Sequence, residues 1–145
     1  MTEPGPLPRP RPPLPTLLVV DDEPSLRRVL ERSLGQFGFR VIGAASAETA
    51  YDLLASEPAD AVLLDIQLPT MSGLALYLAI VHRWPSLEGR IAIMTGDAEA
   101  DDVRTWLERH PCTLIRKPFT LREVADWLGD VLRRRPERER GKAGA

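Results

Sequence analysis

Short apolar runs alternate with longer segments of helical period through most of this chain of 145 residues. Five runs are rich in Val, Ile, Leu and Ala, and they lie at 17–20, 40–44, 61–64, 91–94 and 113–115. Near-continuous apolar runs of this length are typical of strands buried on both faces of a parallel sheet. The segments between them have the spacing of amphipathic helices. The pattern therefore predicts an α/β fold of five repeated β-α units.

Capping residues and prolines set the expected bounds of the helices. Pro24 suits the first turn of a helix, Ser46 can cap the next one, and Thr120 with Glu123 forms a capping box. Together with the apolar spacing, these signals predict helices from Pro24 to near 35–38, over about 47–56, 73–84 and 98–109, and from Thr120 onwards. The expected core-facing set of the first helix is Leu26, Val29, Leu30, Ser33, Leu34 and Phe37.

The two ends of the chain differ in composition from its middle. Seven of the first 15 residues are proline, which favours an extended tail or linker over a folded core. Residues 133–145 are rich in arginine and lack apolar periodicity, so a second tail is expected there. Residues 16–132 are then expected to form one domain, because the length leaves no room for another.

Charge is unevenly distributed along the chain. The net charge is −2, but residues 16–132 hold 11 basic and 18 acidic side chains, which gives −7. An acidic body argues against non-specific nucleic-acid binding. Arg outnumbers Lys 17 to 2, so Lys117 is the only lysine of this stretch. Without an apolar run of about 20 residues or a secretion signal, no membrane partner and a cytoplasmic location are expected.

Polar and charged residues follow four of the five apolar runs. They are Asp21-Asp22-Glu23, Asp65, Thr95-Gly96-Asp97 and Arg116-Lys117-Pro118. The carboxyl ends of parallel strands meet at one edge of a sheet, and ligands bind there, beside the point where strand order reverses. These groups are therefore expected to converge on one site.

The expected cluster of Asp21, Asp22 and Asp65 calls for a cation. Several carboxylates in a partly desolvated site repel one another, and an all-oxygen cluster suits a hard ion such as Mg²⁺. The ion would let an anionic phosphodonor approach Asp65 as the nucleophile. Lys117 could supply an ammonium and Thr95 a hydroxyl for the phosphoryl oxygens.

Each of these residues has a plainer explanation when it is taken alone. Aspartate is common at strand ends as a turn or cap residue, and a lysine before a proline can be a solvated turn residue. An acidic pair, a lone aspartate, Thr-Gly and the single body lysine at successive strand ends are improbable by chance. The joint placement favours a functional site.

The motifs resemble those of the response-regulator receiver family over about residues 16–132. They are Val-Val-Asp-Asp-Glu (19–23), Leu-Leu-Asp-Ile-Gln-Leu-Pro-Thr-Met-Ser-Gly (63–73), Ile-Met-Thr-Gly-Asp (93–97) and Arg-Lys-Pro-Phe (116–119). The resemblance implies a flavodoxin-like (βα)5 three-layer sandwich with strand order 2-1-3-4-5. It also implies the phosphoacceptor Asp65, Mg²⁺ ligands from Asp21, Asp22, Asp65 and the backbone carbonyl of Gln67, phosphate-binding and switch roles for Thr95 and Lys117, and a cis Lys117–Pro118 bond.

The same resemblance implies the partners and the mode of action. A sensor histidine kinase or a histidine phosphotransfer protein would donate the phosphoryl group, and a downstream protein would recognise the switched surface. Homodimerisation through the fourth helix, fifth strand and fifth helix is a further possibility, with Trp106 as a candidate contact. The chain would catalyse only its own phosphorylation and dephosphorylation, so it is not expected to be an enzyme.

The sequence departs from the family pattern at the position that usually holds an aromatic residue, where Leu114 stands. Switching is therefore expected to differ from aromatic coupling to Thr95. Gln67 and Asp97 are the candidates for tuning the lifetime of the phosphoryl group. His110 is expected to have a surface role.

Two rival functions remain open at this stage. One is an aspartate-nucleophile phosphohydrolase of the haloacid-dehalogenase kind, although such enzymes carry a second acid where Gln67 stands and a nucleophile after the first strand. The other is a degenerate receiver that only binds partners, and the complete set of Asp21, Asp22, Asp65, Thr95 and Lys117 weighs against it.

Overall fold

The computed structural model describes residues 14–133, and every statement on structure below refers to that range. Its elements, in chain order, are β1 Thr16–Val20, α1 Pro24–Gly35, β2 Arg40–Ala44, α2 Ala47–Ser56, β3 Ala61–Asp65, α3 Gly73–Arg83, a 3-10 turn η1 Pro85–Leu87, β4 Ile91–Thr95, α4 Asp101–Arg109, β5 Thr113–Arg116 and α5 Leu121–Arg133. Apart from residues 14, 15 and 133, the two expected tails lie outside the described residues.

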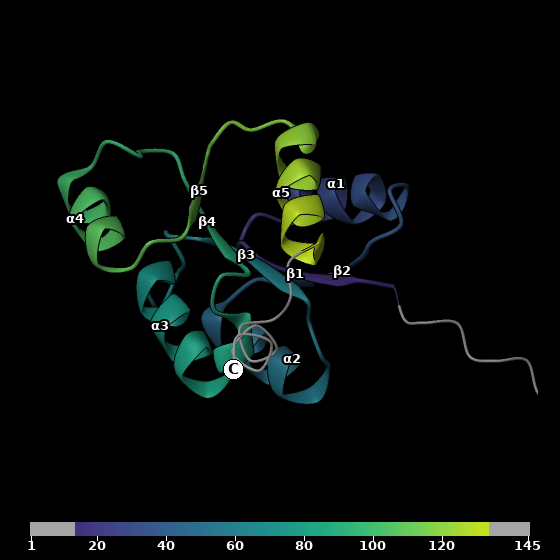
Figure 1. Cartoon of the computed structure of the whole chain (residues 1–145), viewed down its shortest axis with the longest axis horizontal. Helices are drawn as coiled ribbons and strands as arrows, with labels where there is room; N and C mark the ends of the chain where they lie inside the picture. Colours follow the sequence, from purple (N-terminus) through teal and green to yellow (C-terminus); the bar gives the residue numbers. More distant parts are fainter. Residues whose placement is uncertain (1–13, 134–145) are drawn as a thin grey trace, which may run out of the picture.

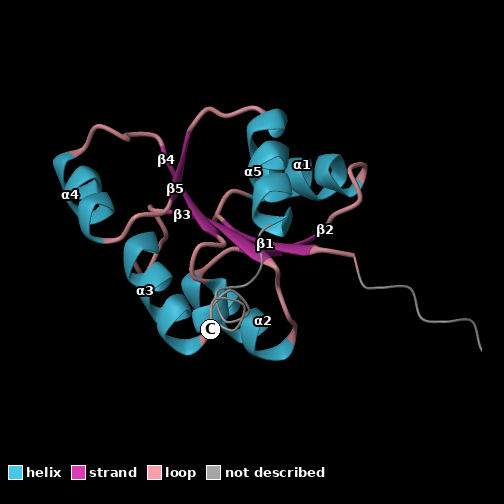
Figure 2. Ribbon diagram, in the orientation of Figure 1, coloured by secondary structure: helices cyan, strands magenta, loops and turns pink. Residues whose placement is uncertain are grey.

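The strands form one parallel sheet in the order β2-β1-β3-β4-β5. Figures 1 and 2 show α1 and α5 together above the sheet, with α2 and α3 below it. The chain first moves from β1 to β2 and then returns to β3 on the other side of β1, so strand order reverses between β1 and β3. This flavodoxin-like three-layer fold is the one that the sequence pattern and resemblance predict.

Alternation within the strands explains why their sequences read as continuous apolar runs. In β1, Leu18 and Val20 face the core between the sheet and helices α2 and α3. Leu17 and Val19 face the core between the sheet and helices α1 and α5. All four side chains are fully buried. A strand covered on both faces needs apolar residues at every position, because successive side chains point to opposite faces.

Two of the predicted caps are present. Ser46 accepts a hydrogen bond from the backbone N–H of Thr49 at 3.2 Å, and Thr120 accepts one from the N–H of Glu123 at 3.2 Å. These bonds satisfy donors that the first turn of a helix leaves unpaired. Within residues 14–133, no helix combines the length and the apolar character needed to cross a bilayer.

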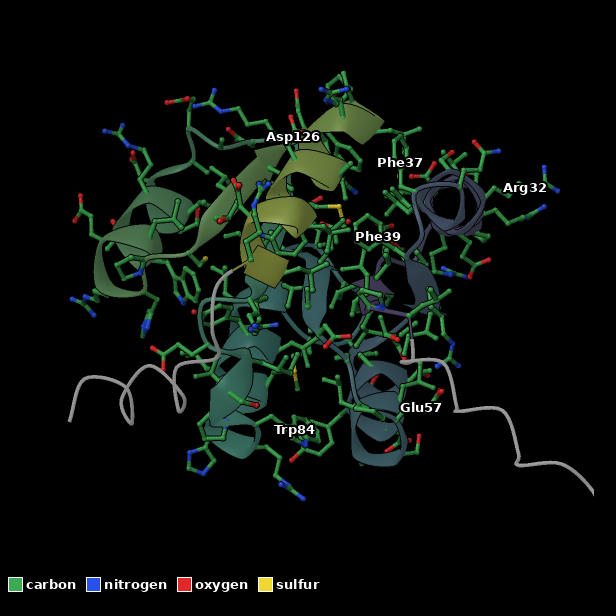
Figure 3. All side chains as sticks on the ribbon, turned by 45° about the vertical axis from the view of Figure 1, so that its right-hand side comes forward. Arg32, Phe37, Phe39, Glu57, Trp84 and Asp126 are labelled. Carbon is green, nitrogen blue, oxygen red and sulfur yellow. The ribbon has the colours of Figure 1, made fainter. Side chains whose placement is uncertain are left out.

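The expected inward positions of Val29 and Phe37 are wrong. Both side chains are half exposed, at 50% and 58%, whereas Leu30 and Leu34 are fully buried. The cause for Phe37 is that α1 ends at Gly35, so position 37 no longer follows the helical face. Gly38 then takes a positive φ of 87° and turns the chain, and Phe39 packs against the core instead (Figure 3).

Several element bounds differ from the sequence expectation. β3, β4 and β5 each extend by one residue, so Asp65, Thr95 and Arg116 are the last residues of their strands. α4 begins at Asp101, about three residues later than expected, because Ala100 keeps an extended backbone, with φ −59° and ψ 134°. The sequence pattern does not predict η1, whose N-cap is Trp84 (Figure 3). The ring centroids of Trp84 and Tyr51 of α2 lie 4.9 Å apart.

Candidate functional site

The carboxyl edge of the sheet brings together the polar residues that follow or end β1, β3, β4 and β5. Asp21 and Asp22 directly follow β1, while Asp65 and Thr95 end β3 and β4 and Lys117 follows β5. β1 and β3 are direct neighbours, and the strand order reverses between them. The site thus lies at the switch point of the sheet, where open α/β folds bind ligands.

Three carboxylates form the centre of the site. Asp21, Asp22 and Asp65 each offer an oxygen, and these oxygens all lie within 4.8 Å of one another. Asp21 is 1% exposed and Asp65 is 7% exposed, while Asp22 is open to solvent. The cluster therefore combines two buried carboxylates with one that is accessible from solvent.

Lys117 joins the two buried carboxylates. Its Nζ donates to Oδ2 of Asp21 and to Oδ2 of Asp65, each at 2.8 Å. The other oxygen of each carboxylate accepts a backbone N–H, from Glu23 at 2.9 Å and from Gln67 at 2.9 Å. Charge-assisted bonds to both oxygens fix the orientation of these side chains.

Burial and charge perturb the ionisation of this pair. Burial raises the pKa of Asp65, aided by the nearby charge of Asp21, although the hydrogen bonds from Lys117 and Gln67 act in the opposite direction. Burial also works against the charge of Lys117, but its bonds to Asp21 and Asp65 outweigh burial and raise its pKa. Lys117 therefore stays charged, and Asp65 is a carboxylate held at an energetic cost.

The donor set of the site fits a divalent cation. Three carboxylates carry −3 when ionised and Lys117 supplies +1, so a formal charge of −2 remains to be balanced. All the candidate ligands are oxygens, which hard ions such as Mg²⁺ prefer. Asp21, Asp22 and Asp65 are the side chains that could hold the ion.

Thr95 connects β4 to the loops on either side of the site. Its side chain is buried, and its hydroxyl oxygen accepts the N–H of Asp97 at 3.0 Å. Its backbone carbonyl accepts the N–H of Lys117 at 2.8 Å. The peptide bond between Lys117 and Pro118 is cis. Movement at Thr95 would thus reach both the β4–α4 loop and the residue that holds Asp65.

Gly73 sets the path of the loop after Asp65, a role that the sequence analysis missed. A Cβ at this position would overlap the backbone carbonyl oxygen of Asp65 and approach Cα of Ile66 to 2.7 Å. The N–H of Gly73 donates to the carbonyl of Ile66 at 2.7 Å, and Gln67 bridges to Ser72. A glycine directly before an apolar helical segment was the available signal, but the sequence does not reveal the close approach.

Arg27 is the second residue that the sequence analysis missed. It lies in the first turn of α1, and its Nη1 donates to the backbone carbonyl of Asp21 at 2.7 Å. No motif marks it, because an arginine on an amphipathic helix ordinarily points to solvent. Only the fold shows that its guanidinium reaches the site.

The candidate tuning and switching residues differ in their exposure. Gln67 and Asp97 are exposed, and Leu114 is partly buried against the core beneath α2 and α3. Trp106 of α4 meets the ring of Tyr77 of α3 edge-on, with 5.0 Å between centroids. His110 stacks against Trp106 at 4.8 Å, so its expected role as a simple surface residue leaves out this ring contact.

Comparison with known proteins agrees with the geometry. The family model of the response regulator receiver domain matches residues 17–128. The response regulator protein PilR of Pseudomonas aeruginosa is 35% identical over 123 residues, which are 84% of this chain and 27% of PilR. The chain spans about half or less of the length of the curated relatives it matches.

Solved structures agree on the fold. The response regulator receiver domain from Clostridium thermocellum has a TM-score of 0.74 at 22% identity, over 83% of this chain and 95% of its own. The response regulator TrrA from Thermotoga maritima, crystallised with Mg²⁺-BeF, has a TM-score of 0.69 at 26% identity, over 81% of this chain and 99% of its own. With the family model covering most of the chain, this protein belongs to the response regulator receiver domain family.

Proposed function

We propose that this receiver domain accepts a phosphoryl group on Asp65, with Mg²⁺ bound by the acidic cluster, and that phosphorylation switches a protein-binding surface. The observation that carries the proposal is the bridge from Lys117 to two buried carboxylates beside the exposed Asp22. A purely structural ion pair has no use for a third carboxylate open to solvent. Support also comes from the relative TrrA, which was crystallised with Mg²⁺-BeF.

Asp65 acts as the nucleophile in this scheme. One of its carboxylate oxygens attacks phosphorus, the bond from phosphorus to the donor atom breaks, and the donor leaves with that electron pair. The product is an acyl phosphate on Asp65. The N–H of Gln67, which already holds Oδ1 of Asp65, keeps the carboxylate oriented during the attack. When bound, Mg²⁺ supplies positive charge against the negative charge that gathers on the phosphoryl oxygens.

Lys117 and Thr95 receive the transferred group. The ammonium of Lys117 lies 2.8 Å from Oδ2 of Asp65 and can turn to a phosphoryl oxygen as that carboxylate loses its charge. The hydroxyl of Thr95 accepts a bond from Asp97 and keeps its own proton for a second phosphoryl oxygen. Both residues change partners when Asp65 is modified, so both can transmit the change.

The switch follows from these new contacts. Thr95 is bonded to the N–H of Asp97 and to the N–H of Lys117, so its movement would shift the population of the loops that begin α4 and end β5. Leu114 stands where the family usually has an aromatic residue, so the ring pair of Trp106 in α4 and Tyr77 in α3 is our candidate for carrying the change to α3. Gln67 and Asp97, exposed beside the site, remain our candidates for setting the phosphoryl lifetime.

The partners and the setting of this domain stay predictions. The phosphodonor would be a sensor histidine kinase or a histidine phosphotransfer protein, and the output would be contact with a downstream protein. A homodimer through α4, β5 and α5 and a cytoplasmic location also stay predictions. We infer that the chain catalyses only its own phosphorylation and dephosphorylation, and the placement of Asp65 on β3 rather than on the first strand argues against a phosphohydrolase of the haloacid-dehalogenase kind.

The test is intact mass spectrometry after incubation with acetyl phosphate, with and without Mg²⁺. The wild type is expected to gain one phosphoryl group only when Mg²⁺ is present, and Asp65→Asn is expected to gain none. Asp52→Asn, which changes an exposed acid on α2, is the matched control and should react as the wild type does. No gain in the wild type would sink the proposal in favour of a binding module.

A further inference from the structure

The helix dipole gives no reason for the arginine in the first turn of α1. A helix N-terminus carries a partial positive charge, so a cation is disfavoured in the first turn. The first turn of α1 contains Arg27 and no acidic residue. The helix dipole therefore does not favour this residue, and its role is to be sought in what the side chain contacts.

That contact is the peptide group between the two acidic residues. Nη1 of Arg27 donates to the backbone carbonyl of Asp21 at 2.7 Å. This carbonyl belongs to the planar unit that joins Asp21 to Asp22, so holding the oxygen also fixes the position of the Cα of Asp22. Asp22 is the exposed member of the three-carboxylate cluster, and among residues 14–133 no hydrogen bond or ion pair holds its side chain. The guanidinium thus restrains the backbone at the residue that carries the exposed carboxylate.

The carbonyl of Asp21 lies just beyond the end of the strand ladder, where Arg27 supplies its donor. β1 ends at Val20, and its ladder with β2 ends at Val20 and Ala44. The N–H of Asp21 still donates to the carbonyl of Ala44 at 3.0 Å, so the backbone groups of Asp21 face β2, which ends at Ala44. Where the ladder stops, a partly buried carbonyl needs another donor.

Gly43 makes room for the arginine to reach it. Gly43 lies inside β2, beside Val19 of β1, where a glycine weakens a strand and commonly marks a close approach. A Cβ built at this position would lie 3.0 Å from Cδ of Arg27, 3.5 Å from its Nε and 3.4 Å from Oε1 of Glu31. The stem of Arg27 thus crosses directly over the backbone of Gly43.

We propose that Arg27 is a positioning residue for Mg²⁺, which holds the Asp21–Asp22 peptide so that the carboxylate of Asp22 faces Asp21 and Asp65, and that Gly43 keeps the path of its side chain open. The inference rests on the proposed function, because it assigns Arg27 to the same metal site. The guanidinium is itself a cation near that site, so its charge alone would repel Mg²⁺. Positioning and repulsion predict effects of opposite sign when Arg27 is removed.

The test is a Mg²⁺ titration of the full chain, followed by amide NMR shifts at constant pH and ionic strength. Arg27→Met is expected to weaken Mg²⁺ binding about tenfold, as loss of a supporting residue commonly does. Arg28→Met, the adjacent exposed arginine on the same helix, is the matched control and should bind as the wild type does. Mg²⁺ binding that is unchanged or tighter in Arg27→Met would overturn the proposal, whatever happens to its stability.

Gly43→Ala gives a second, independent perturbation that keeps the arginine. It is expected to weaken Mg²⁺ binding in the same direction but less, and the double variant should bind no worse than Arg27→Met, because both changes act through one contact. Additive losses would contradict the shared path and overturn the role of Gly43. If the wild type itself fails to bind Mg²⁺, the proposed function falls and the positioning role falls with it, whereas failure of the positioning role alone leaves wild-type binding intact.

Discussion

At Asp65, burial and the neighbouring positive charge shift the pKa in opposite directions. It is 7% exposed, and one ammonium and one backbone N–H hold its two oxygens. Burial nevertheless dominates and raises its pKa. The ionised form of such a carboxylate is poorly stabilised before the reaction. This suits a nucleophile, because after the attack the negative charge lies on the phosphoryl oxygens instead.

Replacing Asp65 by Asn should stabilise the fold at pH 7 without Mg²⁺. An acid whose pKa is raised by folding stabilises the fold when it is protonated, and this contribution is lost as pH rises through the folded-state pKa. Asp65→Asn carries no such charge at any pH. Its advantage should shrink as pH falls from the raised folded-state pKa towards 3.8, the ordinary value for this group, and should be smallest below 3.8. Urea unfolding at several pH values measures it, and a variant less stable than the wild type at pH 7 would contradict the account.

Removing the ammonium of Lys117 should slow the phosphorylation of Asp65 strongly. Loss of one preorganised donor to a transferred group costs about 10²- to 10³-fold in rate, and Lys117→Met removes the donor that bridges Asp21 and Asp65. The rate of mass gain from acetyl phosphate is the measurement. Arg116→Met is the control, because Arg116 pairs with Glu99 on the surface. Equal rates in the two variants would argue against a role for Lys117.

Some features of the helices and strands are determined by the local sequence, and others depend on tertiary structure. The strands and the caps at Ser46 and Thr120 follow from apolar runs and capping residues, whereas the order of the strands in the sheet comes from the family resemblance. The end of α1 is different: Phe37 and Phe39 are two apolar residues of similar size, and only the turn at Gly38 decides that Phe39 is the one that packs inward. Burial after a helix end depends on tertiary geometry, which periodicity does not record.

The site could be foreseen for the same reason that the sheet could. Asp21, Asp65, Thr95 and Lys117 lie at strand ends, and the topology of a parallel sheet alone brings such ends together. Arg27 and Gly73 could not be foreseen, because each acts through a backbone atom of an acidic residue. Contacts of a side chain or a Cα with a distant carbonyl leave no pattern in the sequence.

The junction of β3 and α3 depends on the missing side chain of Gly73. Gly73→Ala should destabilise the fold by about 1–3 kcal/mol, the usual cost of forcing extra atoms into a packed place, because the new Cβ would meet the carbonyl of Asp65. Gly35→Ala at the end of α1 is the control, since a Cβ there meets nothing within 4 Å. Thermal unfolding compares the two, and a loss no greater for Gly73→Ala than for Gly35→Ala would show that the junction can relax.

In the whole molecule, folding brings an excess of negative charge together at one edge of the sheet. The three carboxylates and Lys117 together carry a formal charge of −2 when the acids are ionised. They lie at the ends of strands that are buried on both faces. Their mutual repulsion is a cost to the entire fold, because unfolding would separate them. A cation bound by the folded state should therefore raise the stability of the whole domain.

Adding Mg²⁺ should stabilise the folded chain by mass action. At one hundred times the dissociation constant, the expected gain is about 2.7 kcal/mol in the free energy of unfolding. Asp22→Ala should lose most of this gain, although Asp22 is exposed and contributes little packing. Glu108→Ala, an exposed acid on α4, should keep it. A gain that is equal in all three proteins would mean that Mg²⁺ acts on general surface charge.

The most direct test of the central claim locates the phosphoryl group. After reaction with acetyl phosphate and Mg²⁺, borohydride reduces an acyl phosphate on aspartate to homoserine, and peptide mass spectrometry finds the altered residue. We predict homoserine at position 65, at the end of β3 beside Lys117, and at no other aspartate. Homoserine at Asp21 or Asp22, or none at all under conditions in which Mg²⁺ binds, would contradict it.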